Sequence, residues 1–261
     1  MAGATGWTGS ALSHALRNSP KFELVNGLSR SKAGQDLGQV LEGRNWNVPL
    51  LDSVEMACAD ASIFIDYTSH NSVFSNVTEA IKSGAHVVIG SSGLSSSDFE
   101  TIDKLAQEKN VGVIASGNFA LTAALAQACS KLVAKHLPSW EIVDYAWAGK
   151  PDAPSGTARE LAETLSALQK PTYALSPESS SGPEGARGAD IDGTRVHSIR
   201  LPGVLHVGTD AVFGMKDERL IIKFEAADSP HPYVFGTLLA AELVSHHVGL
   251  IRGLDTLLFD I

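Results

Sequence analysis

The chain has 261 residues, which suits two small domains or one large one. Its hydrophobic content of 44% is that of a globular protein, and no apolar run reaches the roughly 18 residues needed to cross a membrane. The formal net charge of −9 argues against general nucleic-acid binding, which needs basic patches, so we expect neither a nucleic-acid nor a membrane partner.

A glycine-rich segment, residues 3–9, comes directly before residues 10–17, which have helical periodicity. Glycines let the backbone approach a dinucleotide pyrophosphate at a helix N-terminus, although the G-x-x-G-x-x-G spacing also fits a turn that binds no ligand. Only Met1 and Ala2 precede the segment, so the first strand of a nucleotide-binding fold is either very short or begins upstream. The residues assigned here to cofactor binding are Gly3, Thr5, Gly6, Trp7 and Thr8.

The next predicted strand, residues 22–28, ends at a basic loop that contains Arg30 and Lys32. An acidic residue at the end of this second strand would select a free ribose 2′-hydroxyl, whereas a basic residue accommodates a 2′-phosphate. The loop has no carboxylate, which favours NADPH over NADH, although NADH stays possible. We assign Arg30 to cofactor binding; the alternative is a solvated basic loop.

Strands and helices alternate through the rest of the first half, which predicts right-handed βαβ units and a Rossmann-like parallel sheet. Ligands of such sheets lie beyond the carboxyl ends of the strands, where this chain has small and polar residues. His70 and His86 also lie in this half, but lone histidines of this kind are more often structural. The strands are expected at residues 62–67, 86–90 and 111–115, the helices at 73–83 and 99–109, and the cofactor contacts at Thr68, Gly90, Ser92, Asn118 and Phe119.

The second half has a different pattern. After a predicted helix over residues 121–137, alternation of apolar and polar residues predicts a strand over 141–147 and further strands towards the C-terminal side. This pattern predicts a second, α+β domain with a mainly antiparallel sheet. The later elements are a Ser-, Gly- and Pro-rich loop at 176–188, strands at 196–201, 205–213 and 218–226, and an apolar helix at 233–243.

The least generic segment is Lys-Pro-Asp-Ala-Pro-Ser-Gly-Thr-Ala, residues 150–158. Its two prolines exclude regular structure, and residues 158–165 then have the pattern of an amphipathic helix. A helix N-terminus flanked by a lysine and by hydroxyl groups can bind an anion, and an ordinary capped helix fits the same residues.

This segment resembles the substrate loop of the dihydrodipicolinate reductases (4-hydroxy-tetrahydrodipicolinate reductases). The family's Asp-Phe-Thr, Gly-Thr-Thr-Gly and Asn-Phe elements are similar to residues 66–68, 90–93 and 118–119, in the same order. The resemblance implies that Lys150, Ser155, Gly156 and Thr157 hold a substrate carboxylate and that Lys150 is catalytic. It also implies that the C-terminal helix returns to the first domain and that a homotetramer forms through the sheet of the second.

The chain departs from the family just before the lysine, where the two histidines of a Glu-x-His-His element fall at Ala146 and Trp147. The first histidine is thought of as the proton donor, and neither Ala nor Trp transfers a proton near neutral pH. The family's arginine near residues 227–230 is also missing. Tyr145 and Trp147 either shape a flatter, more apolar pocket or pack as strand residues. Other candidate substitutes, each also explained as a surface residue, are His197 and His206 as proton donors and Arg187 and Arg200 as positive charges.

We therefore expect an NAD(P)H-dependent reductase that resembles the enzyme of lysine and diaminopimelate biosynthesis and transfers a hydride to a C=N or conjugated C=C bond of a small cyclic carboxylate. The alternatives are a paralogous reductase of a different imine or enamine acid and a non-catalytic dinucleotide-binding protein. Residues 1–119 and 230–261 are expected to bind the dinucleotide, and residues 120–229 the substrate and other subunits. Two cysteines and the lack of a signal peptide indicate the cytoplasm, and no metal is expected.

Overall fold

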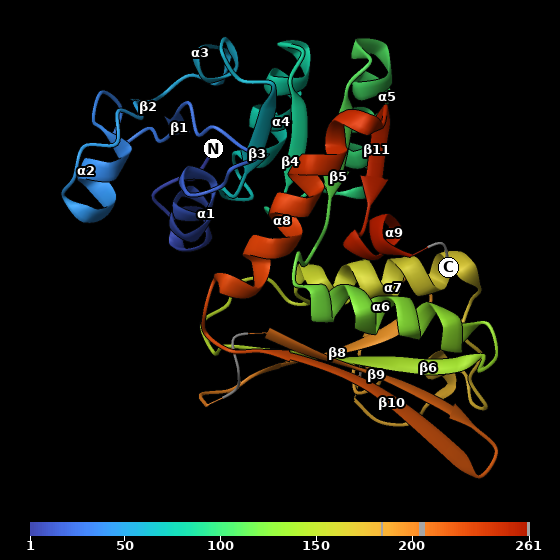
Figure 1. The fold of residues 1–261 in the computed structure, drawn as a ribbon. Coiled ribbons are helices and arrows are strands. Elements are labelled where there is room, and N and C mark those ends of the chain that lie inside the picture. Colours follow the sequence, from blue (N-terminus) through green and yellow to red (C-terminus); the bar gives the residue numbers. More distant parts are fainter. Residues whose placement is uncertain (184, 204–206, 260–261) are drawn as a thin grey trace. The chain divides into compact units, whose positions relative to one another are not determined.

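The computed structural model describes residues 1–183, 185–203 and 207–259, and it divides the chain into two compact units. The first unit consists of Met1–Ala120 and Pro230–Leu257, so it is built from both ends of the chain. The second unit contains Leu121–Ser229. Each unit has its own sheet, whose strands are labelled in Figure 1, and its own buried core.

The first unit contains a parallel sheet with the strand order β11-β5-β4-β3, which confirms the predicted Rossmann-like arrangement. Ala2 extends this sheet because it bridges both Asp66 of β3 and Leu28, and its N–H donates to the Ile65 carbonyl at 2.8 Å. Leu28 belongs to a two-residue strand, β1, which pairs with β2. The strands are β1 (Gly27–Leu28), β2 (Leu50–Leu51), β3 (Ile63–Asp66), β4 (His86–Ile89), β5 (Gly112–Ala115) and β11 (Gly249–Arg252).

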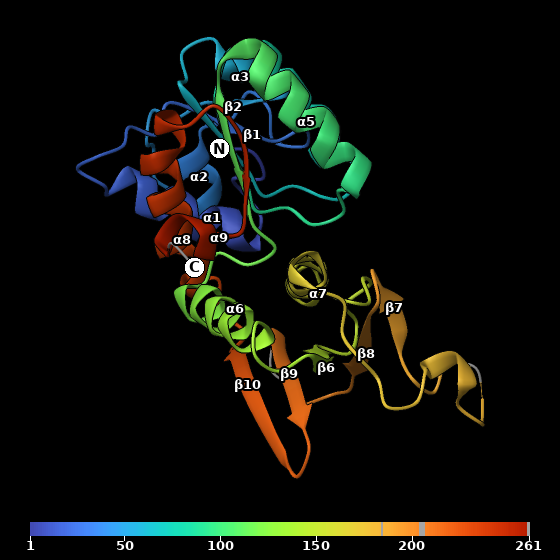
Figure 2. The ribbon, with the colours of Figure 1, turned by 90° about the vertical axis from the view of Figure 1, so that its right-hand side faces the viewer.

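Helices cover both faces of this sheet. Helices α4 and α5 bury Val77, Ile81 and Ile102 in one cluster with the strand residues Val87 and Val113. Helix α1 packs against α8, and Figure 2 shows α5 and α8 on opposite sides of the sheet. The helices of this unit are α1 (Trp7–Arg17), α2 (Leu37–Glu42), α3 (Val54–Cys58), α4 (Val73–Lys82), α5 (Ser96–Lys109), α8 (His231–Leu243), the 3-10 turn η2 (Val244–His246) and α9 (Leu254–Leu258).

The second unit is a five-stranded mixed sheet with the order β10-β9-β6-β8-β7. Every neighbouring pair is antiparallel except β6 and β8, which run parallel, so the sheet is mainly antiparallel as predicted. Helices α6 and α7 lie together on one face of it (Figure 1). The elements are α6 (Leu121–Ala134), β6 (Ser139–Ala146), α7 (Gly156–Leu168), the 3-10 turn η1 (Pro177–Ser179), β7 (Ala189–Ile191), β8 (Thr194–Arg200), β9 (Val207–Met215) and β10 (Glu218–Ala226).

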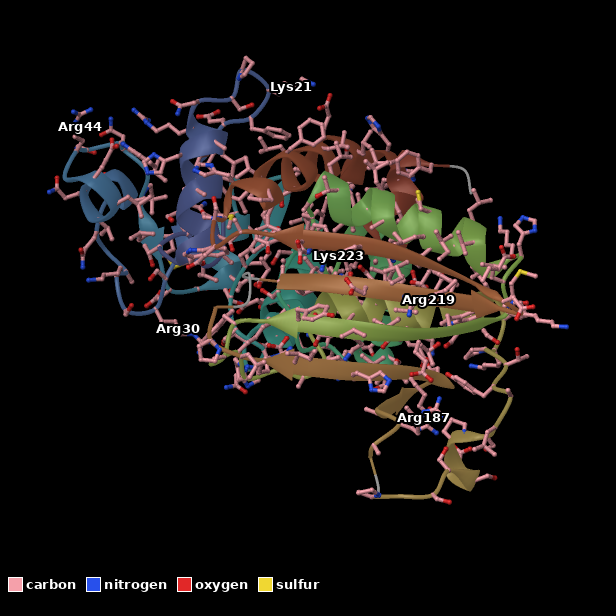
Figure 3. The ribbon with its side chains drawn as sticks, turned by 90° about the horizontal axis from the view of Figure 1, so that it is seen from below. Lys21, Arg30, Arg44, Arg187, Arg219 and Lys223 are labelled. Carbon is pink, nitrogen blue, oxygen red and sulfur yellow. The ribbon has the colours of Figure 1, made fainter. Side chains whose placement is uncertain are left out.

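Strand β6 shows how the sequence pattern fixes the two faces of this sheet. Its burial alternates along the strand, with Trp140, Ile142, Asp144 and Ala146 buried on the face that α6 and α7 cover. The residues between them, including Tyr145, lie on the opposite face, which Figure 3 shows towards the viewer. A side chain on β6 therefore faces either the helices or the outer surface, according to the parity of its position.

Several boundaries differ from the sequence prediction. Helix α1 begins at Trp7 instead of Ser10, and α5 begins at Ser96 because Ser95 and Asp98 form a capping box. The strand predicted over residues 22–28 is limited to β1, because only Gly27 and Leu28 pair with other strand segments. The short elements α2, β2, α3, β11 and α9 were not predicted, since two to six residues carry too little periodicity.

Within the described ranges, no helix is both long and apolar enough to cross a membrane. Across the same residues, no group of three or more His, Cys, Asp or Glu side chains is arranged to hold a metal ion.

Candidate active site

The glycine-rich loop joins the carboxyl-end side of the first unit's sheet to the N-terminus of α1. Gly3 has a φ of +72°, and a Cβ atom there would come within 3.0 Å of the Tyr67 carbonyl oxygen, so only glycine fits. Gly6 caps α1 without any side-chain hydrogen bond, and the first turn of the helix has no acidic residue. A helix N-terminus that follows glycines and lacks an acidic cap is suited to a pyrophosphate, so the residues present fit the dinucleotide that the motif implies.

Trp7 and Thr8 form the start of α1, and Thr5 lies in the loop before it. The Trp7 side chain is 44% exposed and meets the Tyr233 ring edge-on, with 6.1 Å between ring centroids. Arg30 follows β1 and is exposed to solvent, as Figure 3 shows. Arg30 therefore lies at the end of the second strand segment, where the sequence placed it.

A buried carboxylate, Asp66, organises the loops at the carboxyl ends of β3 and β4. It accepts hydrogen bonds from the Thr68 N–H at 2.9 Å and the Thr68 hydroxyl at 2.7 Å. The Ser91 hydroxyl donates to it at 2.6 Å and the Asn76 amide at 3.0 Å. Asp66 thus ties the predicted residue Thr68 to the loop that contains Gly90 and Ser92. Asp66 lies in a predicted strand and in a family motif, but no role was predicted for it.

Tyr67 packs beneath the same loop. A Cβ atom on Gly90 would come within 3.0 Å of its ring, which explains the glycine. The Tyr67 hydroxyl is 2.6 Å from the Thr237 hydroxyl on α8, and burial raises the pKa of Tyr67. Tyr67 therefore stays a neutral phenol that fixes the loop. Ser92, in the same loop, is exposed.

The segment after β5 is more buried than a ligand-binding loop need be. Asn118 accepts a hydrogen bond from the Ala120 N–H at 2.8 Å, and the Ser116 hydroxyl donates to the Asn118 carbonyl at 2.9 Å. Phe119 is 1% exposed, and its ring lies tilted beside Tyr67 with 6.4 Å between centroids. The Phe119 side chain is thus part of the core of the first unit.

In the second unit, the segment from Lys150 to Ser155 leads from β6 into α7. The Lys150 N–H donates to the Trp147 carbonyl at 3.1 Å, which closes a turn. The Lys150 ammonium forms an ion pair with Asp152, with Nζ 2.6 Å from Oδ1. The Ala153–Pro154 peptide is cis. Asp152 is therefore the ion-pair partner of Lys150, the residue on which the prediction of carboxylate binding depends.

Ser155 is the N-cap of α7, which begins at Gly156 and not at the predicted residue 158; Ser155 is 1% exposed and both of its donors are used internally. Its N–H donates to Asp144 Oδ2 at 2.9 Å, and its hydroxyl donates to Asp144 Oδ1 at 2.7 Å. The same hydroxyl accepts the Ala158 N–H at 3.3 Å. Gly156 and Thr157 form the next residues of the helix and are partly exposed. Lys150, Gly156 and Thr157 are thus better placed than Ser155 to meet a ligand.

The substitutes considered for the missing histidines separate onto the two faces of the sheet. Tyr145 lies on the outer face, where its hydroxyl donates to Asp210 at 3.2 Å. His197 lies there too, 2.7 Å from Glu141, and Arg187 contacts the same carboxylate. These contacts explain the positions of the Tyr145, His197 and Arg187 side chains without a bound ligand. His206 lies outside the described residues.

On the helix-covered side, Arg200 of β8 contacts the segment that contains Lys150. Its guanidinium donates to Asp144 at 2.7 Å and to the Asp152 carbonyl at 2.8 Å. Ala146 is buried, while Trp147 is 44% exposed and its indole ring lies over Gly149. No role in the site was predicted for Asp144 or Asp152. The alternation of β6 places Asp144 on the buried face, and a carboxylate at a buried position is the signal that could have identified it.

These features define a class of protein. A parallel βαβ sheet, a glycine-rich loop at a helix N-terminus and polar loops at the strand ends are typical of nicotinamide-dinucleotide oxidoreductases. The family model described as the N-terminus of dihydrodipicolinate reductase matches residues 1–119, and the model of its C-terminus matches residues 119–258. The chain belongs to the dihydrodipicolinate reductase family.

Individual relatives agree with this assignment. The chain is 31% identical over 258 residues to the 4-hydroxy-tetrahydrodipicolinate reductase of Lactiplantibacillus plantarum, covering 99% of this chain and 98% of the relative. It is 32% identical over 263 residues to that of Lysinibacillus sphaericus, with the same coverage. A solved dipicolinate-bound dihydrodipicolinate reductase from Paenisporosarcina sp. TG-14 superposes with a TM-score of 0.75 at 27% identity, covering 98% of this chain and 97% of that one.

A more distant structure, an amine dehydrogenase from Mycobacterium smegmatis, shares the fold with a TM-score of 0.61 at 14% identity, covering 96% of this chain and 93% of that one. The predicted family, fold class and enzyme class are therefore confirmed. The chain is a nicotinamide-dependent reductase of the dihydrodipicolinate reductase type.

Proposed function

We propose that this protein reduces 4-hydroxy-tetrahydrodipicolinate, or the unsaturated cyclic imine derived from it, in the biosynthesis of diaminopimelate and lysine. The observation that carries the proposal is the Lys150–Thr157 segment, in which hydrogen bonds and an ion pair hold a lysine close to a helix N-terminus. The substrate is a small dicarboxylate, and this segment offers the charge and the donors to bind one of its carboxylates.

Lys150, Gly156 and Thr157 are the residues that we propose to contact that carboxylate, with Ser155 shaping the helix start. Each charge-assisted hydrogen bond contributes about 1.5–3 kcal/mol. In the described structure the Lys150 ammonium contacts Asp152. The substrate carboxylate must therefore share or replace that partner, and Lys150 then stabilises the charge that develops on the substrate during reduction.

We propose NADPH as the preferred cofactor, with NADH as a possible second one. Gly3, Thr5, Gly6, Trp7 and Thr8 would hold the pyrophosphate through the backbone and the α1 N-terminus. Arg30 would pair with the 2′-phosphate. When bound, the reduced nicotinamide supplies the hydride.

The other cofactor residues proposed lie at the ends of β3, β4 and β5. Thr68 and the Gly90–Ser92 loop, both tied to Asp66, and the backbone of Asn118 and Phe119 would orient the nicotinamide half.

A second candidate function follows from Ala146 and Trp147. General acid catalysis typically contributes about 10²–10⁴-fold to a rate, so the parent reaction would be slow without a replacement donor. The exposed Trp147 indole beside Lys150 instead suits an apolar or planar ring on the substrate. A paralogous reductase of a different cyclic imine or enamine acid is therefore the rival proposal.

We further propose that the first unit binds the dinucleotide, that the second binds substrate, and that the enzyme is a cytoplasmic homotetramer. The outer face of the second unit's sheet supports assembly, because β10 presents Ile221 on that face with 43% of it exposed. Figure 3 shows Arg219 and Lys223 on the same strand and Arg187 beyond the other edge, so charged groups lie on either side of this apolar residue.

The test is NADPH oxidation, followed by absorbance, with 4-hydroxy-tetrahydrodipicolinate made enzymatically in the assay. Lys150→Ala should lower kcat/KM by about tens of fold, since it removes a charge-assisted contact. Lys170→Ala is the matched control, because the Lys170 ammonium donates to the Asp192 carbonyl instead. Its kcat/KM should match that of the wild type.

The outcomes separate the candidates. Turnover that depends on Lys150 supports the proposed reaction. Dipicolinate and NADPH binding without turnover of this substrate, but with turnover of another cyclic imine acid, supports the paralogous reductase. Binding of both without turnover of any imine acid supports a non-catalytic protein, and binding of neither contradicts all three.

A further inference from the structure

We propose that Asp144 and Arg200 form a buried ion pair that positions the Lys150–Thr157 segment for an anionic substrate. Neither residue needs to touch the substrate in this role. The inference rests on the proposed binding of a carboxylate by that segment, and it adds two positioning residues from β6 and β8 to it.

The first argument is the burial of Asp144. Its side chain is 0% exposed and faces α6 and α7 between Ile142 and Ala146. A carboxylate in such a place costs several kcal/mol unless its charge is neutralised and its oxygens are hydrogen-bonded. A purely structural strand would have an apolar residue at this inward position. The carboxylate therefore calls for an explanation that packing does not give.

The second argument is what Asp144 contacts. The N–H and hydroxyl of Ser155 donate to its two oxygens at 2.9 and 2.7 Å, and the Ser198 hydroxyl donates at 3.0 Å. Arg200 adds a charged donor at 2.7 Å. Two of these four bonds go to the N-cap of α7, so Asp144 fixes where that helix begins and how its first turn is oriented.

The third argument is that Arg200 reaches the other end of the segment. The nitrogen that donates to Asp144, Nη2, also donates to the carbonyl oxygen of Asp152 at 2.8 Å. Asp152 is in turn the ion-pair partner of Lys150. One guanidinium thus connects the buried carboxylate under the helix with the backbone beside the lysine, which fixes the spacing between the two groups proposed to bind the ligand.

The fourth argument is that Arg200 neutralises the charge of Asp144 near the N-terminus of α7. A lone carboxylate directly beneath a helix N-terminus would offset its positive end and repel an incoming anion. Arg200 lies 2.7 Å from Asp144 and balances that charge locally. The segment can then attract a substrate carboxylate through Lys150 and the start of α7, which a lone Asp144 would oppose.

The experiment uses Asp144→Asn and the matched control Glu141→Gln in the full-length protein. Glu141 is on the same strand, but it lies on the outer face and pairs with Arg187 and His197. Titration of dipicolinate into NADPH-saturated protein gives a Kd for each variant. Asp144→Asn should weaken dipicolinate binding by about tenfold or more, because a misplaced binding group loses that much, while NADPH affinity stays within about twofold. Glu141→Gln should bind dipicolinate like the wild type.

Two further variants separate positioning from stability. Asp144→Asn leaves the Arg200 charge buried and unpaired, so its melting temperature should fall. The double variant Asp144→Asn/Arg200→Gln removes both charges and should recover part of that loss. Positioning predicts that dipicolinate binding stays weak in the double variant, whereas a merely structural pair predicts that binding recovers with stability. Asp144→Glu, which keeps the charge, should bind better than Asp144→Asn.

Each failure has a distinct signature. If the wild type does not bind dipicolinate, the proposed function fails first. If the wild type binds it and Asp144→Asn binds it equally well, the proposed function stands and the positioning role is wrong.

Discussion

Asp66 offers the sharpest stability test in the first unit. It is 0% exposed, and its carboxylate accepts four hydrogen bonds, from the Thr68 N–H, the Thr68 and Ser91 hydroxyls and the Asn76 amide. Replacing it by asparagine keeps the volume but turns one oxygen into an NH₂ group. If the new NH₂ group takes the place of Oδ1, it faces the Thr68 N–H, which is a fixed donor. If it takes the place of Oδ2, it faces the Asn76 amide, which must turn over and give up its bond to the Thr68 hydroxyl.

The expected cost follows from those contacts. Leaving one buried donor unsatisfied costs about 1–3 kcal/mol, and the remaining bonds weaken because their acceptor is no longer charged. We expect Asp66→Asn to lower the free energy of unfolding by about 2–4 kcal/mol. Thr68 and the Ser91 loop should also lose their fixed orientation, so NADPH should bind about tenfold more weakly.

Urea unfolding of the cofactor-free protein and fluorescence titration with NADPH measure the two effects. Asp98→Asn is the control, since Asp98 is a carboxylate of the same unit that only caps the exposed start of α5. Its cost should be about 1 kcal/mol, with NADPH affinity unchanged. An Asp66→Asn protein that unfolds at the wild-type urea concentration and binds NADPH normally would refute this account of the loops.

Two further predictions concern charge. Arg30→Asp should raise the KM for NADPH about tenfold or more while leaving that for NADH unchanged or lower, because a 2′-phosphate loses its cation; equal effects on both cofactors would remove Arg30 from the phosphate site. The Nδ1 atom of His86 accepts the Gly112 N–H at 2.9 Å, and burial lowers the pKa of this histidine below its ordinary value of 6.5. As the pH falls below 6.5, His86 therefore takes up a proton more readily in the unfolded chain than in the folded one. The contribution of neutral His86 to stability should thus be fully present above pH 6.5 and be lost as the pH falls below it. Between about pH 7 and pH 5, the urea midpoint of His86→Asn should therefore fall less than that of the wild type. An identical pH dependence of the two midpoints would contradict this role of His86.

The sequence predicted the elements that have strong periodicity or capping signals. Strand β10 has the predicted bounds, and a helix follows the Pro-rich turn as expected, although α7 begins two residues earlier than predicted. The return of the C-terminal helix to the first unit came from the family resemblance, because no local pattern of residues encodes which unit a helix joins.

The candidate site was less predictable because its partners are distant in sequence. Ser155 and Asp144 are 11 residues apart, and Arg200 lies 56 residues from Asp144, so only the parallel pairing of β6 with β8 brings them together. The same pairing shows why His197 does not face the lysine segment. It lies beside Val143 on the outer face, whereas Ser198 and Arg200 lie beside Asp144 and Ala146 on the inner one.

The most direct test of the central claim is a crystal structure of the protein with NADPH and dipicolinate, read for the distance from the Lys150 ammonium to the ligand. We predict a dipicolinate carboxylate within hydrogen-bond distance of Lys150 Nζ and of the Gly156 or Thr157 N–H, with Asp144 still bonded to Ser155. A ligand bound elsewhere, with Lys150 still paired to Asp152, would contradict the account.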